Sequence, residues 1–301
     1  MKQEVFESIV RQSRTPQAQE ASIAYLTEHL SRFLKQGERV LICFSEYKEG
    51  NLAWLMEQAV QRSGAMPVVW GPDRKWKTLL RQAFSHKVSA IIGAPLIVLG
   101  LTKLARQSAT PLSIRKVITA GYPCMQWMID GIVKGFDCEM GGCFTLEQTS
   151  VVAGFACGHS WGIHLRSDVY GVEIVDEAGV ALPEGEVGEI ILFPVNMPEL
   201  RYPMGEKACL VKQQCSCGSE TPRLLELQYG SGTNNELAEL GQLLHSWTSI
   251  LDCRMYRSEY GLEIEVVTFP GEKLPKLPSA AKLVVRPWNP EEDQPFMYIP
   301  Q

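Results

Sequence analysis

A regular alternation of apolar runs and amphipathic segments between residues 39 and 144 most constrains how this chain folds. The runs are short and rich in β-branched residues, as buried strands are. They are RVLICF, MPVVWG, VSAIIGA and RKVITAG. The segments between them repeat their apolar residues at helical spacing; they are NLAWLMEQAVQRSG, WKTLLRQAFSHK and PLIVLGLTKLARQ. Strands that alternate with helices form a parallel sheet covered by helices, so we predict an α/β fold with a doubly wound, mostly parallel sheet.

The rest of the chain divides into three further parts. Residues 1–38 are expected to be helical, because Ile23, Leu26 and Leu30 recur at helical spacing. After Ser150 the alternation ends, and short strand-like runs separated by the turn-rich AGVALPEGE predict an antiparallel β region. The polar, glycine-rich YGSGTNNEL then leads into a small α+β segment. The predicted units are therefore 1–38, 39–150, 151–225 and 226–301.

The charge balance argues against some classes of partner. The chain has 29 basic and 34 acidic residues, a net charge of -5, which disfavours a broad surface for nucleic acid or for an anionic membrane. No apolar stretch approaches the roughly 18 residues of a spanning helix, and MKQEVFESIV is acidic where a signal peptide is basic. We expect a cytoplasmic protein whose partners are small molecules or other proteins.

The cysteines cluster in the region expected to be antiparallel. Four of the nine lie between Cys157 and Cys217, a distribution that favours a metal site over a disulfide scaffold. Zinc takes about four Cys or His ligands, commonly from a Cys-x-Cys knuckle and a distant Cys/His pair. The segment CSCG supplies Cys215 and Cys217, with a glycine that allows the tight turn of a knuckle.

The segment CGHSWGIH supplies the other half of the predicted site. It offers Cys157 and His164, with His159 as a competing ligand. We predict zinc bound by Cys157, His164, Cys215 and Cys217, a four-ligand set that leaves no open position for water. Such a site is structural, which disfavours a zinc-dependent hydrolase. The alternative is that these residues are unrelated buried cysteines, which behave as small hydrophobic side chains.

A series of short motifs follows the same stretch of chain in a fixed order. They are AC at 156–157, GIH ending at His164, Asp168, EIVD from Glu173, PEGEVGE from Pro183, RYPMGE from Arg201 and CSCG from Cys215. In this order they resemble the phenylacetate-CoA ligase branch of the AMP-forming acyl-CoA synthetase (adenylate-forming ligase) superfamily. Upstream, AGYP at 120–123 stands where that family has Gly-Ala-Glu-Pro, and CFTLE at 143–147 stands where it has Tyr-Gly-x-Thr-Glu.

This resemblance implies a nucleotide site and a reaction. In that family a carboxylate attacks ATP to give an acyl-adenylate, and coenzyme A then displaces AMP. The resemblance implies AMP or ATP with magnesium as cofactor and a small carboxylic acid or adenylate as partner. It assigns a catalytic, magnesium-associated role to Glu147 and a ribose contact to Glu206. The remaining nucleotide-binding residues that it implies are Gly121, Tyr122, Pro123 and Arg223.

The sequence departs from the family at positions that the chemistry needs. The stretch RQSRTPQAQEAS has no glycine where the ligases carry a phosphate loop, and no clear Gly-Lys motif stands near residue 301. A phosphate cradle needs glycine's conformational freedom and open backbone N–H groups. We therefore hold two hypotheses: a divergent acyl/aryl-CoA ligase-like protein that binds an adenylate or carboxylic acid, or a catalytically inactive module that partners another protein.

Overall fold

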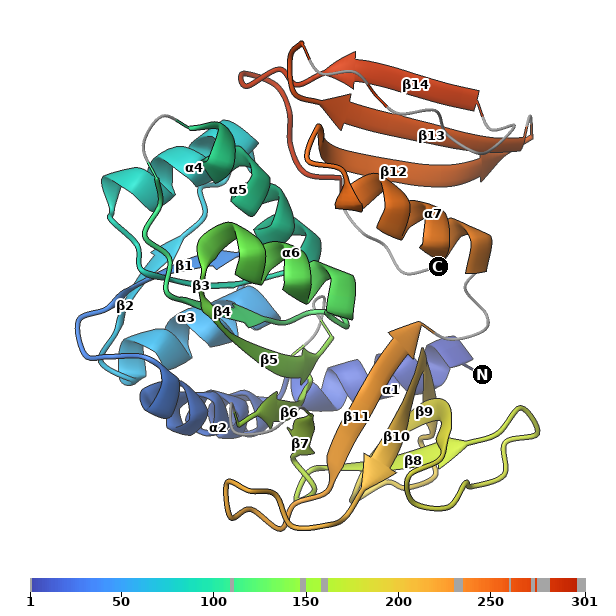
Figure 1. The fold of residues 1–301 in the computed structure, drawn as a ribbon. Coiled ribbons are helices and arrows are strands. Elements are labelled where there is room, and N and C mark those ends of the chain that lie inside the picture. Colours follow the sequence, from blue (N-terminus) through green and yellow to red (C-terminus); the bar gives the residue numbers. More distant parts are fainter. Residues whose placement is uncertain are drawn as a thin grey trace.

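The molecule is built around a parallel sheet, as the alternation in the sequence predicts (Figure 1). The computed structural model describes residues 2–108, 111–146, 150–157, 162–229, 235–259, 261–271, 274 and 282–296. The parallel strands are β1 (Arg39–Cys43), β2 (Met66–Val69), β3 (Ala90–Gly93), β4 (Lys116–Thr119) and β5 (Glu139–Thr145). They lie in the order β2-β1-β3-β4-β5, and each neighbouring pair is parallel.

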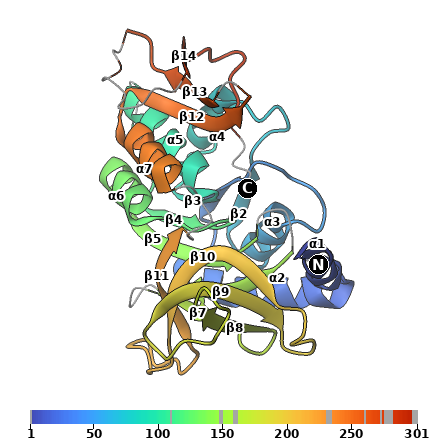
Figure 2. The same cartoon turned by 90° about the vertical axis from the view of Figure 1, so that its right-hand side faces the viewer.

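Helices cover both faces of the parallel sheet (Figures 1 and 2). One face carries α2 (Pro16–Phe33) and α3 (Leu52–Arg62), and the other carries α4 (Trp76–Ser85), α5 (Pro95–Gln107) and α6 (Gln126–Phe136). Local chemistry sets where these helices begin: the Asn51 side chain accepts a hydrogen bond from the backbone N–H of Trp54, and a proline opens α5. The chain turns from β2 back past β1 to β3, which confirms the doubly wound arrangement.

An antiparallel half continues the same sheet. It joins β5 through β6 (Val152–Ala156) and β7 (Ile163–Leu165), and the complete order is β2-β1-β3-β4-β5-β6-β7-β11-β10-β9-β8. The remaining strands are β8 (Tyr170–Val175), β9 (Val187–Pro194), β10 (Tyr202–Val211) and β11 (Arg223–Tyr229). Helix α1 (Lys2–Ser13) packs against β10. The sequence predicted the antiparallel character of this region but not its continuity with the parallel strands.

The last part of the chain forms a second, small sheet that lies over α5 and α6 (Figures 1 and 2). It contains α7 (Asn235–Ser246), β12 (Ile250–Ser258), β13 (Gly261–Thr268) and β14 (Lys282–Pro287). Strand β13 pairs with β12 antiparallel and with β14 parallel. One helix and three strands agree with the α+β segment expected from the sequence. We refer to α7 and β12–β14 as the C-terminal module.

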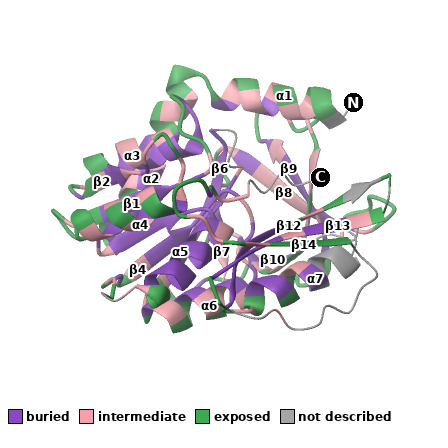
Figure 3. Ribbon diagram, turned by 90° about the horizontal axis from the view of Figure 1, so that it is seen from above, coloured by how far each residue is buried: buried purple, intermediate pink, exposed green. Residues whose placement is uncertain are grey.

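Three separate hydrophobic cores hold these parts in the described ranges (Figure 3). The parallel strands β1, β3 and β4 are buried on both faces, whereas the edge strand β2 exposes Met66. Leu26 of α2 packs in the core of the parallel half, whereas Ile9 of α1 packs in the core of the antiparallel half. The two N-terminal helices therefore join different cores. No helix in the described ranges is long and apolar enough to cross a membrane.

Candidate metal centre and adjoining cleft

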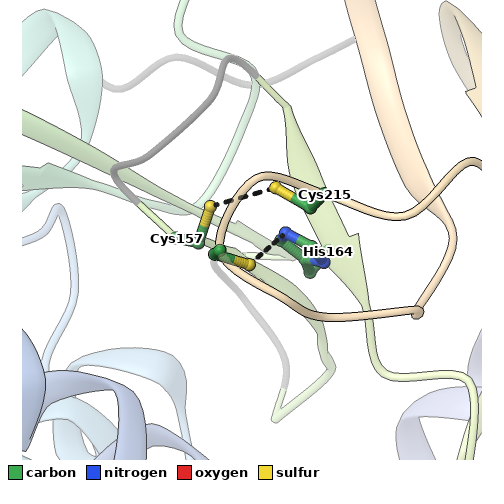
Figure 4. Close-up of side chains that lie close together, drawn as sticks. Cys157, His164 and Cys215 are labelled. Atoms are coloured by element: carbon green, nitrogen blue, oxygen red, sulfur yellow. Dashed lines mark hydrogen bonds between the residues drawn. The ribbon is translucent and has the colours of Figure 1, made fainter.

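The four predicted metal ligands come together in space although they are far apart in sequence. Cys157 directly follows β6, His164 lies in β7, and Cys215 and Cys217 lie in the loop between β10 and β11. Their ligand atoms all lie within 4.8 Å of one another. Figure 4 shows that the side chains of Cys157, His164 and Cys215 point toward a common centre. The competing ligand His159 lies outside the described residues.

The distances within this cluster fit a zinc ion and exclude a disulfide. The Sγ atoms of Cys157 and Cys215 are 3.7 Å apart, and Cys217 Sγ is 3.5 Å from His164 Nε2. Tetrahedral zinc with bonds of about 2.3 Å to sulfur and about 2.0 Å to nitrogen separates such atom pairs by roughly 3.8 and 3.5 Å. A disulfide needs an S–S distance of about 2.05 Å. The donor set, three thiols and one imidazole, is one of the sets that structural zinc sites use.

Hydrogen bonds outside the cluster orient its ligands. His164 Nδ1 lies 2.8 Å from Thr221 Oγ1, which in turn lies 2.9 Å from Ser219 Oγ. With Nδ1 engaged by this hydroxyl, Nε2 faces the thiols. The knuckle itself is closed by a bond from the Gly218 N–H to the Cys215 carbonyl, with Gly218 at φ +89°. The sequence predicted this glycine turn but not Thr221.

Arg223 lies beside the Cys/His cluster. It pairs with His164 across β11 and β7, is only 8% exposed, and donates from its guanidinium to the Gln213 carbonyl at 3.2 Å. This bond braces the loop that carries Cys215 and Cys217. Arg223 does not line the cleft described below. The nucleotide contact that the resemblance assigns to Arg223 stays a prediction.

A cleft of about 1300 Å³ opens next to the cluster. One wall comes from the parallel half, with Pro123 after β4, Thr145 at the end of β5, and Val133 of α6. The facing wall comes from β6, β7 and β11; its residues are Ala156, Gly162, Ile163 and Leu224 to Gln228. The cleft thus lies between the two halves of the large sheet.

Two of the predicted nucleotide segments meet in this cleft. The backbone N–H of Gly121 donates to Thr145 Oγ1 at 2.7 Å, and Gly121 has a φ of +105° that favours glycine. This bond joins the AGYP turn to the end of the CFT strand. Tyr122 and Pro123 line the cleft, and the Tyr122 hydroxyl accepts a hydrogen bond from the Leu96 N–H at 3.1 Å. Gly121, Tyr122 and Pro123 therefore lie together at its edge.

Of the two predicted acidic site residues, the structure describes only Glu206. Glu147 lies outside the described residues. Glu206 lies in β10 and is not among the residues that line the cleft. Burial raises the pKa of Glu206 to about 7, and its Oε2 atom is buried without a hydrogen-bond partner in the described part of the chain. The ribose role of Glu206 stays a prediction.

A second, smaller cavity of about 180 Å³ lies at the carboxyl ends of the parallel strands. Ser45 follows β1, Ala94 follows β3, and Tyr122 separates this cavity from the larger cleft, because it lines both. Asp252 and Phe296 close it from the side of the C-terminal module. Doubly wound folds bind ligands at the carboxyl ends of the strands, at the point where the strand order reverses. The alternation of strands and helices in the sequence could therefore have indicated this cavity.

Comparison with known proteins identifies the fold. No protein-family model matches the sequence, and no curated protein matches it. Among solved structures, 2-hydroxyisobutyryl-CoA ligase in the postadenylation state in complex with R3-HIB-AMP aligns with a TM-score of 0.63 and 15% identity. The alignment covers 83% of this chain and 58% of the ligase, so the chain spans less than two thirds of its length.

Two aryl-CoA ligases give similar alignments. The benzoate CoA ligase from Burkholderia xenovorans LB400 aligns with a TM-score of 0.55 and 15% identity, over 88% of this chain and 62% of the ligase. The anthranilate CoA ligase AuaEII in complex with anthranoyl-AMP aligns with a TM-score of 0.53 and 13% identity, over 85% of this chain and 54% of the ligase. Alignments at identities this low show similarity of fold alone. The chain therefore has the fold of the AMP-forming acyl-CoA ligases.

Proposed function

We propose that this chain binds an adenylate or a carboxylic acid in the large cleft, as a divergent relative of the phenylacetate-CoA ligase branch, and that it holds a structural zinc ion. The observation that carries the proposal is the hydrogen bond between Gly121 and Thr145, which joins the two segments that the resemblance places beside the nucleotide. A volume of about 1300 Å³ exceeds what most small-molecule ligands need, so a nucleotide with an acyl group fits.

The cleft has the chemistry that an adenylate requires. The half-buried Tyr122 lines it and offers an aromatic ring on which a purine can stack. Lys134 lines the same cleft and supplies a positive charge for a phosphate. Magnesium, when bound, would neutralise the charge of a departing pyrophosphate. The carboxylate that the resemblance assigns to it, Glu147, lies outside the described residues.

Calorimetric titration of AMP into the zinc-loaded protein tests this proposal. Gly142 lines the cleft, and a Cβ built there meets nothing within 4 Å, so larger side chains at this position project into open space. We expect wild type and Gly142→Ala to bind AMP, and Gly142→Phe to lose it because the ring occupies the cleft. Equal AMP affinity in Gly142→Phe and wild type would show that the nucleotide, if bound, lies elsewhere.

The second candidate function is a binding module without ligase activity. Two observations favour it: Glu206 does not line the cleft, and residues 11–22 form the corner between α1 and α2 rather than a glycine-rich loop. Pyrophosphate release from ATP, measured with a panel of aryl and fatty acids, separates the two functions. Release with any acid supports a ligase. AMP binding without release across the panel supports the binding module.

A further inference from the structure

The two halves of the large sheet are joined by a narrow seam. Strand β7 has three residues, and it pairs with β6 through three residue pairs and with β11 through only two. The adjoining β5–β6 pairing also has three, whereas β4 and β5 share four pairs and β10 and β9 share five. We use the term seam for β6, β7 and the first residues of β11. Short pairings of this kind are marginal by themselves.

The four candidate metal ligands lie across this seam. Cys157 is attached to the end of β6, His164 belongs to β7, and the loop with Cys215 and Cys217 leads into β11. A single bound ion would therefore tie together all the elements that connect the parallel half to the antiparallel half. Among the described residues of the seam, the cysteines form no disulfide, and no strand pairing at β7 exceeds three residue pairs.

The same elements form one wall of the cleft. Ala156 lines the cleft and directly precedes Cys157, and Ile163 lines it and directly precedes His164. Leu224 also lines it and pairs with Ile163. Each ligand on the seam strands is thus one residue away from a cleft-lining side chain. The opposite wall of the cleft comes from β5 and α6. If the four candidate metal-ligating residues shift relative to one another, the wall formed by β6, β7 and β11 moves relative to that opposite wall.

We infer that the metal ion fixes the seam and thereby the width of the cleft, so that metal binding and ligand binding in the cleft are coupled. The part concerning the ligand rests on the proposed function; the part concerning the seam does not. Coupling between two sites is reciprocal, so zinc must raise the affinity for AMP by the same factor by which AMP raises the affinity for zinc. From typical couplings we expect a factor of about ten.

Hydrogen exchange tests the seam without any nucleotide. Exchange measured by mass spectrometry on zinc-loaded and chelator-treated protein should show loss of protection in β6, β7 and β11 on zinc removal, while β1, β3 and β4 keep theirs. Loss confined to the loop between β10 and β11 would contradict the inference, because the metal would then order only its own loop. Equal loss in all strands would also contradict it, since the metal would then support the whole fold.

The coupling itself is measured with AMP as the probe. AMP affinity is determined for zinc-loaded and zinc-free protein, and zinc affinity is determined with and without saturating AMP, with Cys138→Ser as a control at a cysteine outside the cluster. We expect both affinities to change by the same factor. Unchanged AMP affinity on zinc removal would overturn the coupling. If AMP binds neither form, the proposed function fails, and the exchange pattern alone decides the inference about the seam.

Discussion

At the residue scale, the hydrogen bond from His164 to Thr221 orients one of the proposed metal ligands. The Nδ1–Oγ1 distance of 2.8 Å fixes the ring so that Nε2 faces Cys217. Thr221→Val keeps the shape of the side chain but removes this acceptor. We expect zinc affinity to fall about 10- to 100-fold, as for comparable partners of zinc-bound histidines.

Competition with a chromophoric chelator measures this effect. Thr27→Val is the matched control, because the Thr27 hydroxyl bonds to the Ile23 carbonyl within α2, in another part of the fold. Unchanged zinc affinity in Thr221→Val would show that the imidazole is oriented by other means.

Glu206 gives a prediction about pH. Its pKa is raised from 4.5 to about 7 by burial, so the folded state holds the protonated carboxyl more strongly than the unfolded state does. The stability that this group contributes is therefore present below pH 4.5 and is lost as the pH rises through about 7. Glu206→Gln removes the buried charge. We expect it to stabilise the fold by about 2 kcal/mol at pH 8 and to have little effect at pH 5.

Thermal unfolding at the two pH values tests this prediction. Glu186→Gln serves as the control, because Glu186 is exposed in the turn before β9. An equal shift of Tm by Glu206→Gln at pH 5 and pH 8 would contradict the account of a buried, titrating carboxyl.

The sequence specified the cluster of candidate metal ligands better than its surroundings. That Cys157, His164, Cys215 and Cys217 lie together was predictable, because metal ligands need particular atoms at restricted spacings. Thr221 and Arg223 act on the site through contacts that depend on how β7 and β11 pair, and a threonine or arginine carries no spacing signal of its own. The burial of Glu206 similarly depends on which face of β10 packs against other elements. The sequence of β10 alone does not determine this.

At the element scale, the pairing of β6 with β7 is sensitive to a small change. A Cβ at Gly154 would lie 2.5 Å from the His164 carbonyl oxygen and 2.7 Å from Ile163 Cγ2. Gly154→Ala therefore pushes β7 away, and we expect it to cost about 2 kcal/mol and to weaken zinc binding by displacing His164. Gly142→Ala in β5 is the control, because its Cβ meets nothing within 4 Å.

Chemical denaturation and zinc competition on the two glycine variants check this expectation. The account holds if only Gly154→Ala loses both stability and zinc affinity. It is contradicted if the two variants behave alike.

The strands that were predictable are those whose surroundings are uniform. β1, β3 and β4 are buried on both faces, so each is a continuous apolar run. In the antiparallel region the strand signals are mixed: β7 is short, and β10 contains Pro203 and Gly205. Strand β14 lies beside prolines, and its exposed Leu283 and Val284 follow no alternating pattern. Tertiary pairing, rather than local preference, makes these segments extended.

At the scale of the whole molecule, a buried lysine links the C-terminal module to the parallel half. Lys103 of α5 is 8% exposed and donates from Nζ to the Ile250 carbonyl at 2.8 Å. Burial lowers its pKa to about 8, whereas burial raises the pKa of Asp252 to about 7. Lys103→Met leaves the Ile250 carbonyl and the neighbouring carboxylate without this cation. We expect it to destabilise the protein by about 2 kcal/mol at pH 7.5.

Denaturant unfolding of Lys103→Met and of Lys77→Met measures this contribution. Lys77 has a side chain that is 49% exposed and pairs with Glu291 on the surface, so its replacement should cost less than about 1 kcal/mol. Equal stability of the two variants would show that the buried lysine does not hold the module in place.

The fold as a whole followed from the alternation of strands and helices, and the motif order indicated the ligase resemblance that the structural alignments support. Its detailed assembly did not follow, because the seam and the docking of the C-terminal module depend on contacts between segments far apart in sequence. Lys103 and Ile250, for instance, are separated by 147 positions.

A crystal structure of the zinc-loaded protein soaked with AMP tests the central claim most directly. We predict an anomalous zinc peak about 2.3 Å from the Sγ atoms of Cys157, Cys215 and Cys217. We also predict nucleotide density in the cleft against Tyr122 and Pro123. Absence of the zinc peak, or a cleft without nucleotide at saturating AMP, would contradict the proposal that a zinc ion fixes the seam beside an adenylate-binding cleft.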